Sequence, residues 1–233
     1  MPTARRGDGS GPTAAEHRGG GRWRYPAGAP GDLRVFVAVP LGDAARDEVR
    51  ALVDAVAGDL RVPAAGRLRW AVTENLHLTV RFLGPTAPDR VPDVAAAAES
   101  AARRLAPFQV RIGDPGAFPT PARPRVVWLG IAAGTPELTE LAAALGDELA
   151  ERGWPRDERP FRVHLTLARA DGIPGAAGAV AALTEAATGL DAAWTADRLI
   201  VYQSELGRGA PRYRPLATSL LRGDALHGQP SLG

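Results

Sequence analysis

After its first thirty residues, the chain shows apolar and polar positions in an order that predicts alternating strands and helices. The continuous apolar run 34–39 predicts a buried strand. Apolar residues from Val49 to Leu60 recur at helical spacing, which predicts a helix over 43–60 with one apolar face. The regular alternation over 75–82 predicts a strand with one buried and one polar face.

The first half of this pattern ends with a predicted helix over 88–105 and a strand over 108–112. The same order of elements then follows again. Thr135 and Pro136 mark the start of its first helix, as the expected N-cap and first helical position. The repeated elements are a strand over 125–131, a helix that follows the N-cap Thr135 and ends at Gly153, a strand over 161–167, a helix over 179–188 and a strand over 199–204.

Two pseudo-symmetric β-α-β-α-β lobes with mainly antiparallel sheets around a central cleft are the simplest account, which makes the fold class α+β. We expect one bilobal domain over 32–222, with lobes of about 32–113 and 114–222. Residues 1–31 are rich in Arg, Gly, Pro and Ala and lack the apolar core of a secretory signal. We therefore expect a disordered N-terminal tail there and a flexible C-terminal tail over 223–233.

Both halves carry the sequence His-x-Thr on a predicted strand. His77 and Thr79 share a strand face with Arg81, and His164 shares a face with Thr166. A single histidine in a strand is more often a structural residue than a catalyst. However, the other two histidines lie in the predicted tails, so both histidines of the expected domain fall in the same motif. This repetition favours a shared function.

Two facing imidazoles suit phosphodiester hydrolysis, because one accepts a proton from water while the other donates to the departing ribose oxygen. The hydroxyls of Thr79 and Thr166 could donate to the non-bridging phosphate oxygens, where negative charge accumulates. Nothing marks either threonine as an activated nucleophile, so water is the expected nucleophile. Two histidines with hydroxyl neighbours make a poor divalent-metal site, so we expect neither a metal nor a cofactor.

Composition narrows the class of protein further. The 233 residues include no cysteine, which excludes a disulfide framework and a thiolate zinc site. No stretch approaches the roughly 20 apolar residues needed to span a bilayer, so we expect a cytoplasmic protein without a membrane partner. The formal charge is only +2, which does not indicate a DNA-coating protein. A local arginine-lined site remains open.

Four segments carry a resemblance to a known family. They are RVFVAVP at 34–40, ENLHLTVRFLG at 74–84, FRVHLTLAR at 161–169 and YQSELG at 202–207. In this order and with these flanks, the chain resembles the 2H phosphoesterases (HxTx motif) over about 33–221. Within them it is similar to the RNA 2′,3′-cyclic phosphodiesterases, also called 2′-5′ RNA ligases (LigT-like).

The resemblance implies a hydrolase that opens 2′,3′-cyclic phosphates on RNA ends or cyclic nucleotides to give 2′-phosphomonoesters. It implies that His77 is the proton donor to the leaving oxygen and that His164 is the proton acceptor that activates water. Thr79 and Thr166 correspond to the motif hydroxyls, and Arg169 corresponds to a basic residue that faces the phosphate. The strand parity of Arg169 opposes that of His164, so a bend is required. We expect the protein to act as a monomer.

Other side chains are candidates for substrate binding. Phe36, Tyr202 and Trp70 could stack on a nucleobase, although a buried aromatic residue at a strand end is more often part of the core. Arg81 could steer phosphate, although strand arginines are often only solvated. Two alternative functions remain open: reversible 2′-5′ RNA ligation, and nucleotide or RNA binding without catalysis.

Overall fold

The computed structural model describes residues 28–158, 160–207 and 210–223. Except for 28–31 and Gly223, both predicted tails lie outside the described residues. The helices are α1 (Asp43–Ala57), α2 (Val91–Arg103), α3 (Thr135–Glu151) and α4 (Ala176–Ala186), with short 3₁₀ helices at Ala65–Arg67, Thr73–Asn75 and Pro88–Arg90. The strands are β1 (Leu33–Pro40), β2 (Arg69–Trp70), β3 (His77–Thr86), β4 (Phe108–Thr120), β5 (Arg123–Ala133), β6 (Leu165–Arg169), β7 (Ala193–Ala196), β8 (Arg198–Glu205) and β9 (Arg212–Leu220).

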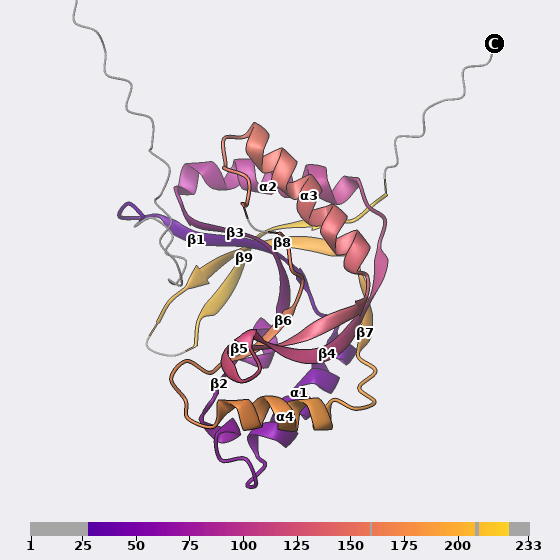
Figure 1. The fold of residues 1–233 in the computed structure, drawn as a ribbon. Helices are drawn as coiled ribbons and strands as arrows, with labels where there is room; N and C mark the ends of the chain where they lie inside the picture. The colour runs from indigo at the N-terminus through magenta and orange to yellow at the C-terminus, as the bar shows by residue number, and fades with distance from the viewer. Residues whose placement is uncertain (1–27, 159, 208–209, 224–233) are drawn as a thin grey trace, which may run out of the picture.

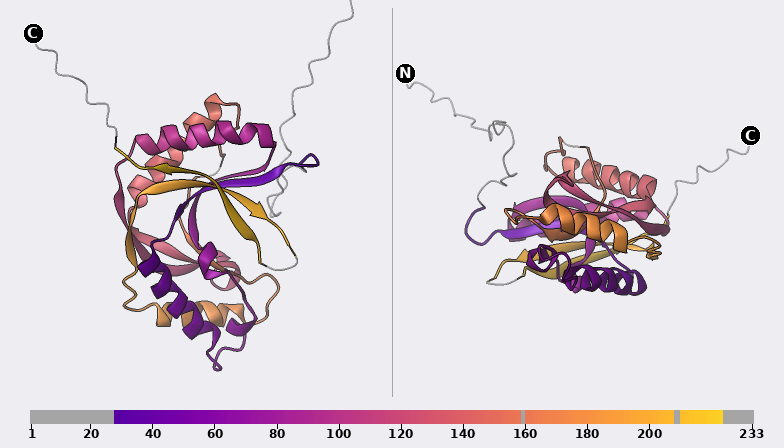
Figure 2. Two further views of the ribbon diagram at one scale, coloured as in Figure 1. Left: turned by 180° about the vertical axis from the view of Figure 1, so that it is seen from behind. Right: turned by 60° about the horizontal axis from the view of Figure 1, so that its bottom comes forward.

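The strands of the described residues form one curled sheet in the order β7-β4-β5-β6-β3-β1-β8-β9, with β2 paired to β6 (Figure 1). All of these pairings are antiparallel. Helices α2 and α3 cover one end of the curl, and α1 and α4 lie side by side at the other (Figure 2). The α+β class with mainly antiparallel pairing is therefore confirmed.

The strand pairing divides the chain differently from the expected lobes 32–113 and 114–222. Strand β4 begins in the first of these ranges but pairs with β5 and β7, while β8 comes from the second range and pairs with β1. Helix α1 likewise packs against α4, and α2 packs against α3. Each half of the sheet therefore combines strands from both ranges, because strand partners are chosen by contacts that local periodicity does not encode.

Helix α1 confirms the predicted apolar face and ends earlier than predicted. Val49, Leu52 and Val56 are buried in the core. The helix stops at Ala57, and the amide of Gly58 donates to a carbonyl of its last turn. Leu60 lies beyond this turn with 92% of its surface exposed, so its predicted place on the apolar face was wrong.

Helix α3 has its N-cap one residue before the predicted position. Gly134 is the N-cap, with a φ of 91°, and Thr135 is the first helical residue. The hydroxyl of Thr135 donates to the carbonyl of Ile131 at 3.3 Å and caps no amide. A glycine is favoured here because the left-handed backbone turns the chain directly from β5 into the helix. The leucines of α3 are fully buried: Leu138, Leu141, Leu145 and Leu149.

Three strands were not predicted from the pattern of apolar and polar residues: β2, β7 and β9. Strands β2 and β7 have two and four residues, too few to show a period. Strand β9 contains Pro215, which argues against a strand in the middle of a sheet. It lies at the end of the strand order, where the missing amide proton is tolerated. No helix among the described residues has the length and apolar character to span a membrane.

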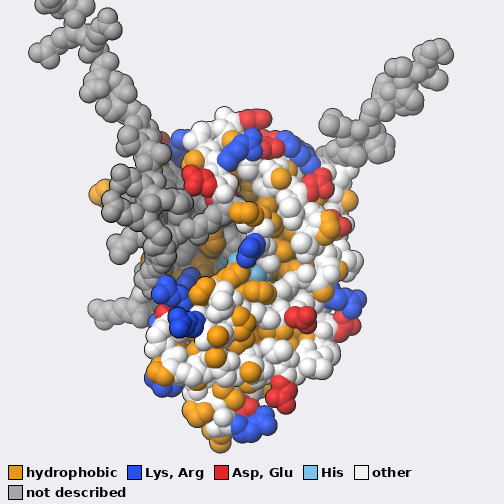
Figure 3. All heavy atoms as spheres, viewed as in Figure 1, with side chains coloured by type: hydrophobic (Ala, Val, Ile, Leu, Met, Phe, Trp, Pro, Cys, Tyr) orange, Lys and Arg blue, Asp and Glu red, His pale blue; other side chains and the backbone are white. Residues whose placement is uncertain are grey.

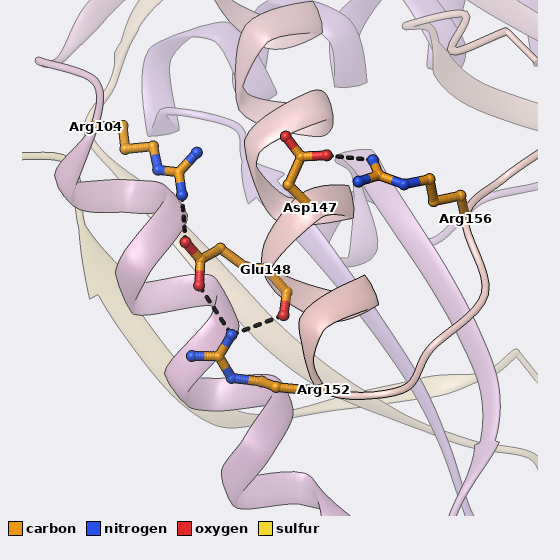
Figure 4. A network of polar contacts seen from close by, with 5 residues as sticks. All are labelled: Arg104, Asp147, Glu148, Arg152 and Arg156. Carbon is orange, nitrogen blue, oxygen red and sulfur yellow. Dashed lines mark hydrogen bonds and ion pairs between the residues drawn. The ribbon is translucent and has the colours of Figure 1, made fainter.

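A polar cluster joins α2 to α3 (Figure 4). The carboxylate of Glu148, only 8% exposed, pairs with Arg104 at the end of α2 and with Arg152 at 2.9 Å. Asp147 pairs with Arg156 in the segment that follows α3. A buried carboxylate needs such partners, because an unpaired charge in the interior is costly. These contacts also fix where the chain leaves α3 on its way to β6.

We predict opposite stability changes for two Gly→Ala substitutions around α3. In Gly134→Ala, the new Cβ would lie 2.7 Å from the carbonyl oxygen of Gln109 at a left-handed φ, which should lower the free energy of unfolding by about 1–3 kcal/mol. Gly146→Ala has open space and a helical backbone, so it should raise that free energy by about 0.5–1 kcal/mol. Urea denaturation of both variants and wild type measures the changes, and equal effects would contradict the assigned start of α3.

Candidate active site

Neighbouring strands β3 and β6 bring the two His-x-Thr motifs together. Leu78 of β3 pairs with Leu165 of β6. In an antiparallel register, the residue before one partner lies across from the residue after the other. His77 therefore lies across from Thr166, and His164 lies across from the other motif threonine. All four side chains share one side of the sheet, here called the histidine face.

Strand β3 contains a bulge at Val80, because adjacent residues of β1 pair with Thr79 and Arg81. One extra residue reverses the alternation of side chains beyond it. Arg81 is consequently buried, with 9% of its surface exposed, whereas Phe82 exposes 54%. The predicted alternation, which placed Phe82 in the core and Arg81 beside His77, was therefore wrong beyond the bulge.

Arg81 is bound to the segment between α3 and β6. Its guanidinium donates to the carbonyl of Pro155 and pairs with the carboxylate of Asp157. These contacts occupy two of its nitrogen atoms on the side of the sheet away from the histidine face. The expected phosphate contact by Arg81 does not fit this arrangement, and Arg81 instead connects β3 to the segment that precedes the second motif.

Strand β6 contains the corresponding bulge at Leu167, because adjacent residues of β5 pair with Thr166 and Ala168. This bulge supplies the bend that the parity of Arg169 required, and it moves that side chain onto the histidine face. The charge of Arg169 acts on Tyr213 and tends to lower its pKa, although burial raises the pKa of this phenol overall. Arg169 and Tyr213 therefore lie near each other.

The two imidazole rings are held in the same way. Nδ1 of His77 lies 2.6 Å from the carbonyl oxygen of Asn75, and Nδ1 of His164 lies 2.7 Å from that of Arg162. A carbonyl oxygen only accepts, so each Nδ1 carries a proton. Among the described residues, no hydrogen bond engages either Nε2. Each Nε2 can therefore accept a proton in the neutral ring or donate one in the cation.

Aromatic rings surround His77. The ring centroid of Phe36 lies 4.9 Å from that of His77, and Tyr213 stands edge-on at 5.3 Å. Tyr202 stacks on Phe36 at 5.2 Å. Phe36 is only 3% exposed, so it supports the other rings and offers no face for the expected stacking on a nucleobase. Tyr202 is half-buried on this face, and Tyr213 was missed because β9 was not predicted.

His164 has different neighbours. Phe118 stands edge-on to it at 5.1 Å, and the ring of Trp128 lies at 6.2 Å. A pocket of about 360 Å³ opens beside these rings. The pocket beside His77 has a volume of only about 50 Å³. Sequence reasoning missed both aromatic neighbours, although Trp128 stood in a predicted strand.

Burial lowers the pKa of both histidines. For His77, burial is the main cause, the charge of His164 lowers the pKa further, and the carbonyl of Asn75 opposes both. For His164, burial is opposed by the carbonyl of Arg162. Because both pKa values lie below that of an ordinary imidazole, both rings are mainly neutral at neutral pH in the unliganded protein.

In Figure 3, histidine atoms are visible at the centre of the face among hydrophobic side chains, with an arginine side chain beside them.

Trp70 faces away from this site. Its indole nitrogen donates to the carbonyl of Ala65 at 3.0 Å, and its ring packs against the core. The expected stacking of Trp70 on a nucleobase does not fit these contacts. In the described part of the chain, no group of three or more His, Cys, Asp or Glu residues is arranged to hold a metal ion.

Comparison with known proteins shows to which family this chain is similar. A model of the 2′-5′ RNA ligase superfamily matches residues 41–208. An Archaeoglobus fulgidus protein named RNA 2′,3′-cyclic phosphodiesterase is 34% identical over 137 residues, which cover 59% of this chain and 72% of that protein. A Thermus thermophilus protein of the same name is 31% identical over 215 residues, covering 84% of this chain and 93% of that protein.

The fold agrees with this match. The crystal structure of Escherichia coli LigT complexed with 3′-AMP is similar with a TM-score of 0.62 and 26% identity, covering 82% of this chain and 98% of LigT. The family resemblance seen in the sequence motifs is thereby confirmed. The matching family model, the similar curled sheet and the paired motifs agree, and the chain belongs to the 2′-5′ RNA ligase superfamily.

Proposed function

We propose that this protein is an RNA 2′,3′-cyclic phosphodiesterase that hydrolyses terminal 2′,3′-cyclic phosphates to 2′-phosphomonoesters. The main observation is the pair of imidazoles on one face of neighbouring strands, each with Nδ1 on a carbonyl and with no hydrogen bond to Nε2 from the residues that the structure describes. The relatives named RNA 2′,3′-cyclic phosphodiesterase support this function, as does the complex of E. coli LigT with 3′-AMP.

The proposed reaction is an in-line displacement at phosphorus. Nε2 of His164 accepts a proton from water while the water oxygen bonds to phosphorus. The bond from phosphorus to O3′ breaks, and Nε2–H of His77 gives its proton to that oxygen. The two rings are fixed alike, so the family resemblance assigns donor and acceptor. Thr79 and Thr166 are proposed to donate hydrogen bonds to the non-bridging oxygens.

Substrate binding supplies the charged imidazole that this reaction needs. In the free protein the pKa of each histidine is lowered, mainly by burial. A bound phosphodiester places a negative charge beside both rings, which favours an imidazolium and raises the pKa. Arg169, on the histidine face, is proposed to share in holding this charge.

The proposed substrate is RNA with a cyclic-phosphate end, or a cyclic nucleotide. DNA is not a substrate in this proposal, because the cyclic phosphate requires a 2′-oxygen. We further propose a cytoplasmic monomer that works without a metal or another cofactor, with residues 32–222 as its catalytic domain. Tyr202, half-buried beside His77, is proposed to contact the substrate.

Reversible 2′-5′ RNA ligation is the second candidate, and the name of the matching family favours it. A ribose 5′-hydroxyl would take the place of water beside His164, so the same two histidines would serve. RNA with one cyclic-phosphate end and one 5′-hydroxyl end separates the activities by product length. A binding module without catalysis would instead bind the RNA and release no product.

We predict that His77→Ala and His164→Ala each lower the rate of hydrolysis at least about 10²-fold, because each removes one proton-transfer group. The assay is cleavage of an oligonucleotide 2′,3′-cyclic phosphate in EDTA, with the position of the product phosphate determined by NMR. His227→Ala, in the predicted tail, is the control and should leave the rate unchanged. Loss of wild-type activity in EDTA, or full activity of either active-site variant, would contradict the mechanism.

The lowered pKa values predict the pH dependence of kcat/KM. A histidine with a lowered pKa loses its proton at a lower pH than an ordinary imidazole. As the pH rises, the protonated form of His77, which is the proton donor, is therefore lost at a lower pH. In the free enzyme, the alkaline limb of kcat/KM should therefore lie below pH ~6.5. The limb of kcat should lie higher, because the bound phosphate raises the pKa. An alkaline limb of kcat/KM at a higher pH than the alkaline limb of kcat would contradict this interpretation.

Thr166→Val should lower kcat by roughly 10²-fold, because the transition state loses one hydrogen-bond donor while the shape of the side chain is kept. Thr166→Ser restores the hydroxyl and should recover most of the activity. Steady-state kinetics on a cyclic nucleotide, with circular dichroism to check folding, measures the effect. Equal activity of the valine and serine variants would exclude a role for the hydroxyl.

A further inference from the structure

Asn75 connects His77 to a distant part of the chain through two polar contacts. Its main-chain carbonyl oxygen lies 2.6 Å from Nδ1 of His77 and accepts the proton of that nitrogen. Its side-chain Nδ2 donates to the main-chain carbonyl of Pro211 at 2.7 Å, although the two residues are 136 positions apart. The reaction described above uses the first contact and gives no role to the second.

The carbonyl of Asn75 belongs to a short helix that has little support of its own. Asn75 is the last residue of the 3₁₀ helix Thr73–Asn75, which has no side-chain cap. Its amide donates to the carbonyl of Val72 at 2.8 Å, which is a bond within the same turn. Among the described residues, the side chain of Asn75 makes the hydrogen bond that ties this helix to a distant segment. The bond to Pro211 therefore helps to fix where the carbonyl lies.

The bond to Pro211 also affects a side wall of the His77 site. Pro211 directly precedes β9, and Tyr213 is the second residue of that strand. The ring of Tyr213 stands edge-on to His77, with the centroids 5.3 Å apart. Asn75 thus contacts His77 directly at Nδ1, and it contacts the start of the strand that borders the same ring. A displacement of Asn75 would disturb both supports of the imidazole.

The second motif has a different residue at the corresponding position. Nδ1 of His164 lies 2.7 Å from the carbonyl oxygen of Arg162, at the same spacing of two residues. Arg162 is exposed, and within the described ranges its side chain donates no hydrogen bond. The two histidines therefore have equivalent acceptors, but the acceptor of the proposed proton donor is additionally anchored by its own side chain.

We propose that Asn75 is a positioning residue for His77, because its side-chain bond to Pro211 fixes the carbonyl that orients the imidazole toward the leaving oxygen. This inference rests on the proposed function and adds a residue that acts through His77 without contacting the phosphate. A general acid must lie within hydrogen-bond reach of the oxygen that it protonates. A misplacement of about 1 Å can lower a rate by about 10²-fold.

The same carbonyl affects how strongly His77 holds its proton. Burial is the main cause that lowers the pKa of His77, the carbonyl of Asn75 raises this pKa, and the charge of His164 in β6 lowers it further. A hydrogen bond to the carbonyl favours the charged imidazolium, so loss of that bond lowers the pKa. Displacement of Asn75 should therefore impair both the aim and the protonation of the donor.

Three other titratable side chains border His77. They are Glu74 from the same 3₁₀ helix, Tyr202 from β8 and Tyr213 from β9. Burial is the main cause that raises the pKa of both tyrosines, so both phenols stay neutral where imidazoles titrate. Glu74 is exposed and is retained in every variant of the test. A change in the pH profile of a variant at position 75 is therefore assigned to the lost contact of Asn75.

The test compares Asn75→Leu, which removes the amide at similar size, with Asn75→Gln, which keeps an amide donor. On adenosine 2′,3′-cyclic phosphate, Asn75→Leu should lower kcat by roughly 10–10²-fold and change KM by less than about twofold, because substrate contacts remain. Asn75→Gln should be at least about fivefold faster than Asn75→Leu. Thr73→Ala, in the same 3₁₀ helix, is the matched control and should keep the wild-type kcat.

Two further measurements separate positioning from general damage to the fold. In Asn75→Leu, the alkaline limb of kcat/KM should move to lower pH, while the acid limb, which follows the proposed acceptor His164, should stay in place. Nitrogen-15 NMR of the imidazoles should show the neutral His77 ring protonated at Nδ1 in wild type, and the proton shared between Nδ1 and Nε2 in Asn75→Leu. The signals of His164 serve as the internal reference and should not change.

A wild-type kcat and pH profile in Asn75→Leu would overturn the proposal, as would equal rates of the leucine and glutamine variants. A raised KM with unchanged kcat would also overturn it, because Asn75 would then act on substrate binding. Loss of activity in Thr73→Ala would assign the effect to the whole helix. If wild type hydrolyses no cyclic phosphate, the proposed function fails, and NMR still decides: a shared proton in Asn75→Leu supports the positioning role, and an unchanged Nδ1 proton overturns it.

Discussion

The pairing of Leu78 with Leu165 is the contact on which the candidate site depends. In the strand order it joins β3 to β6, and so joins the two halves of the curled sheet. Both leucines are fully buried, and burial of a leucine side chain contributes about 1.5–3 kcal/mol. This pairing fixes the register, and the register puts each histidine across from the threonine of the other motif.

The two bulges determine which of the side chains that follow the motifs lie on the histidine face. Each lies just beyond a His-x-Thr motif, at Val80 in β3 and at Leu167 in β6. The second brings Arg169 onto the histidine face, whereas the first turns Arg81 toward Pro155 behind the sheet. Equivalent backbone irregularities therefore have different chemical results, because the residues that follow the motifs differ.

The surroundings of the two histidines are less symmetric than their hydrogen bonds. Each ring is held by a carbonyl at its Nδ1, yet His77 is enclosed by Phe36 and tyrosines while His164 borders an open pocket. The indole of Trp128 forms one wall of that pocket, and it fits there because Gly116 on the neighbouring strand has no Cβ. Two histidines whose rings are held and protonated in the same way can therefore lie beside a substrate whose two sides differ in shape.

The order of the main helices and strands, the buried leucines of α3 and the histidine–threonine pairs could all be predicted from the sequence. These features follow from local periods of two and 3.6 residues, so a single segment contains the information. The family resemblance added the proposed chemistry. The strand partners, the burial of Arg81, the bulge that bends β6 before Arg169, and the positions of Tyr213 and Trp128 became known only from the folded structure. Those depend on bulges and on contacts between residues distant in the chain, which local periodicity does not specify.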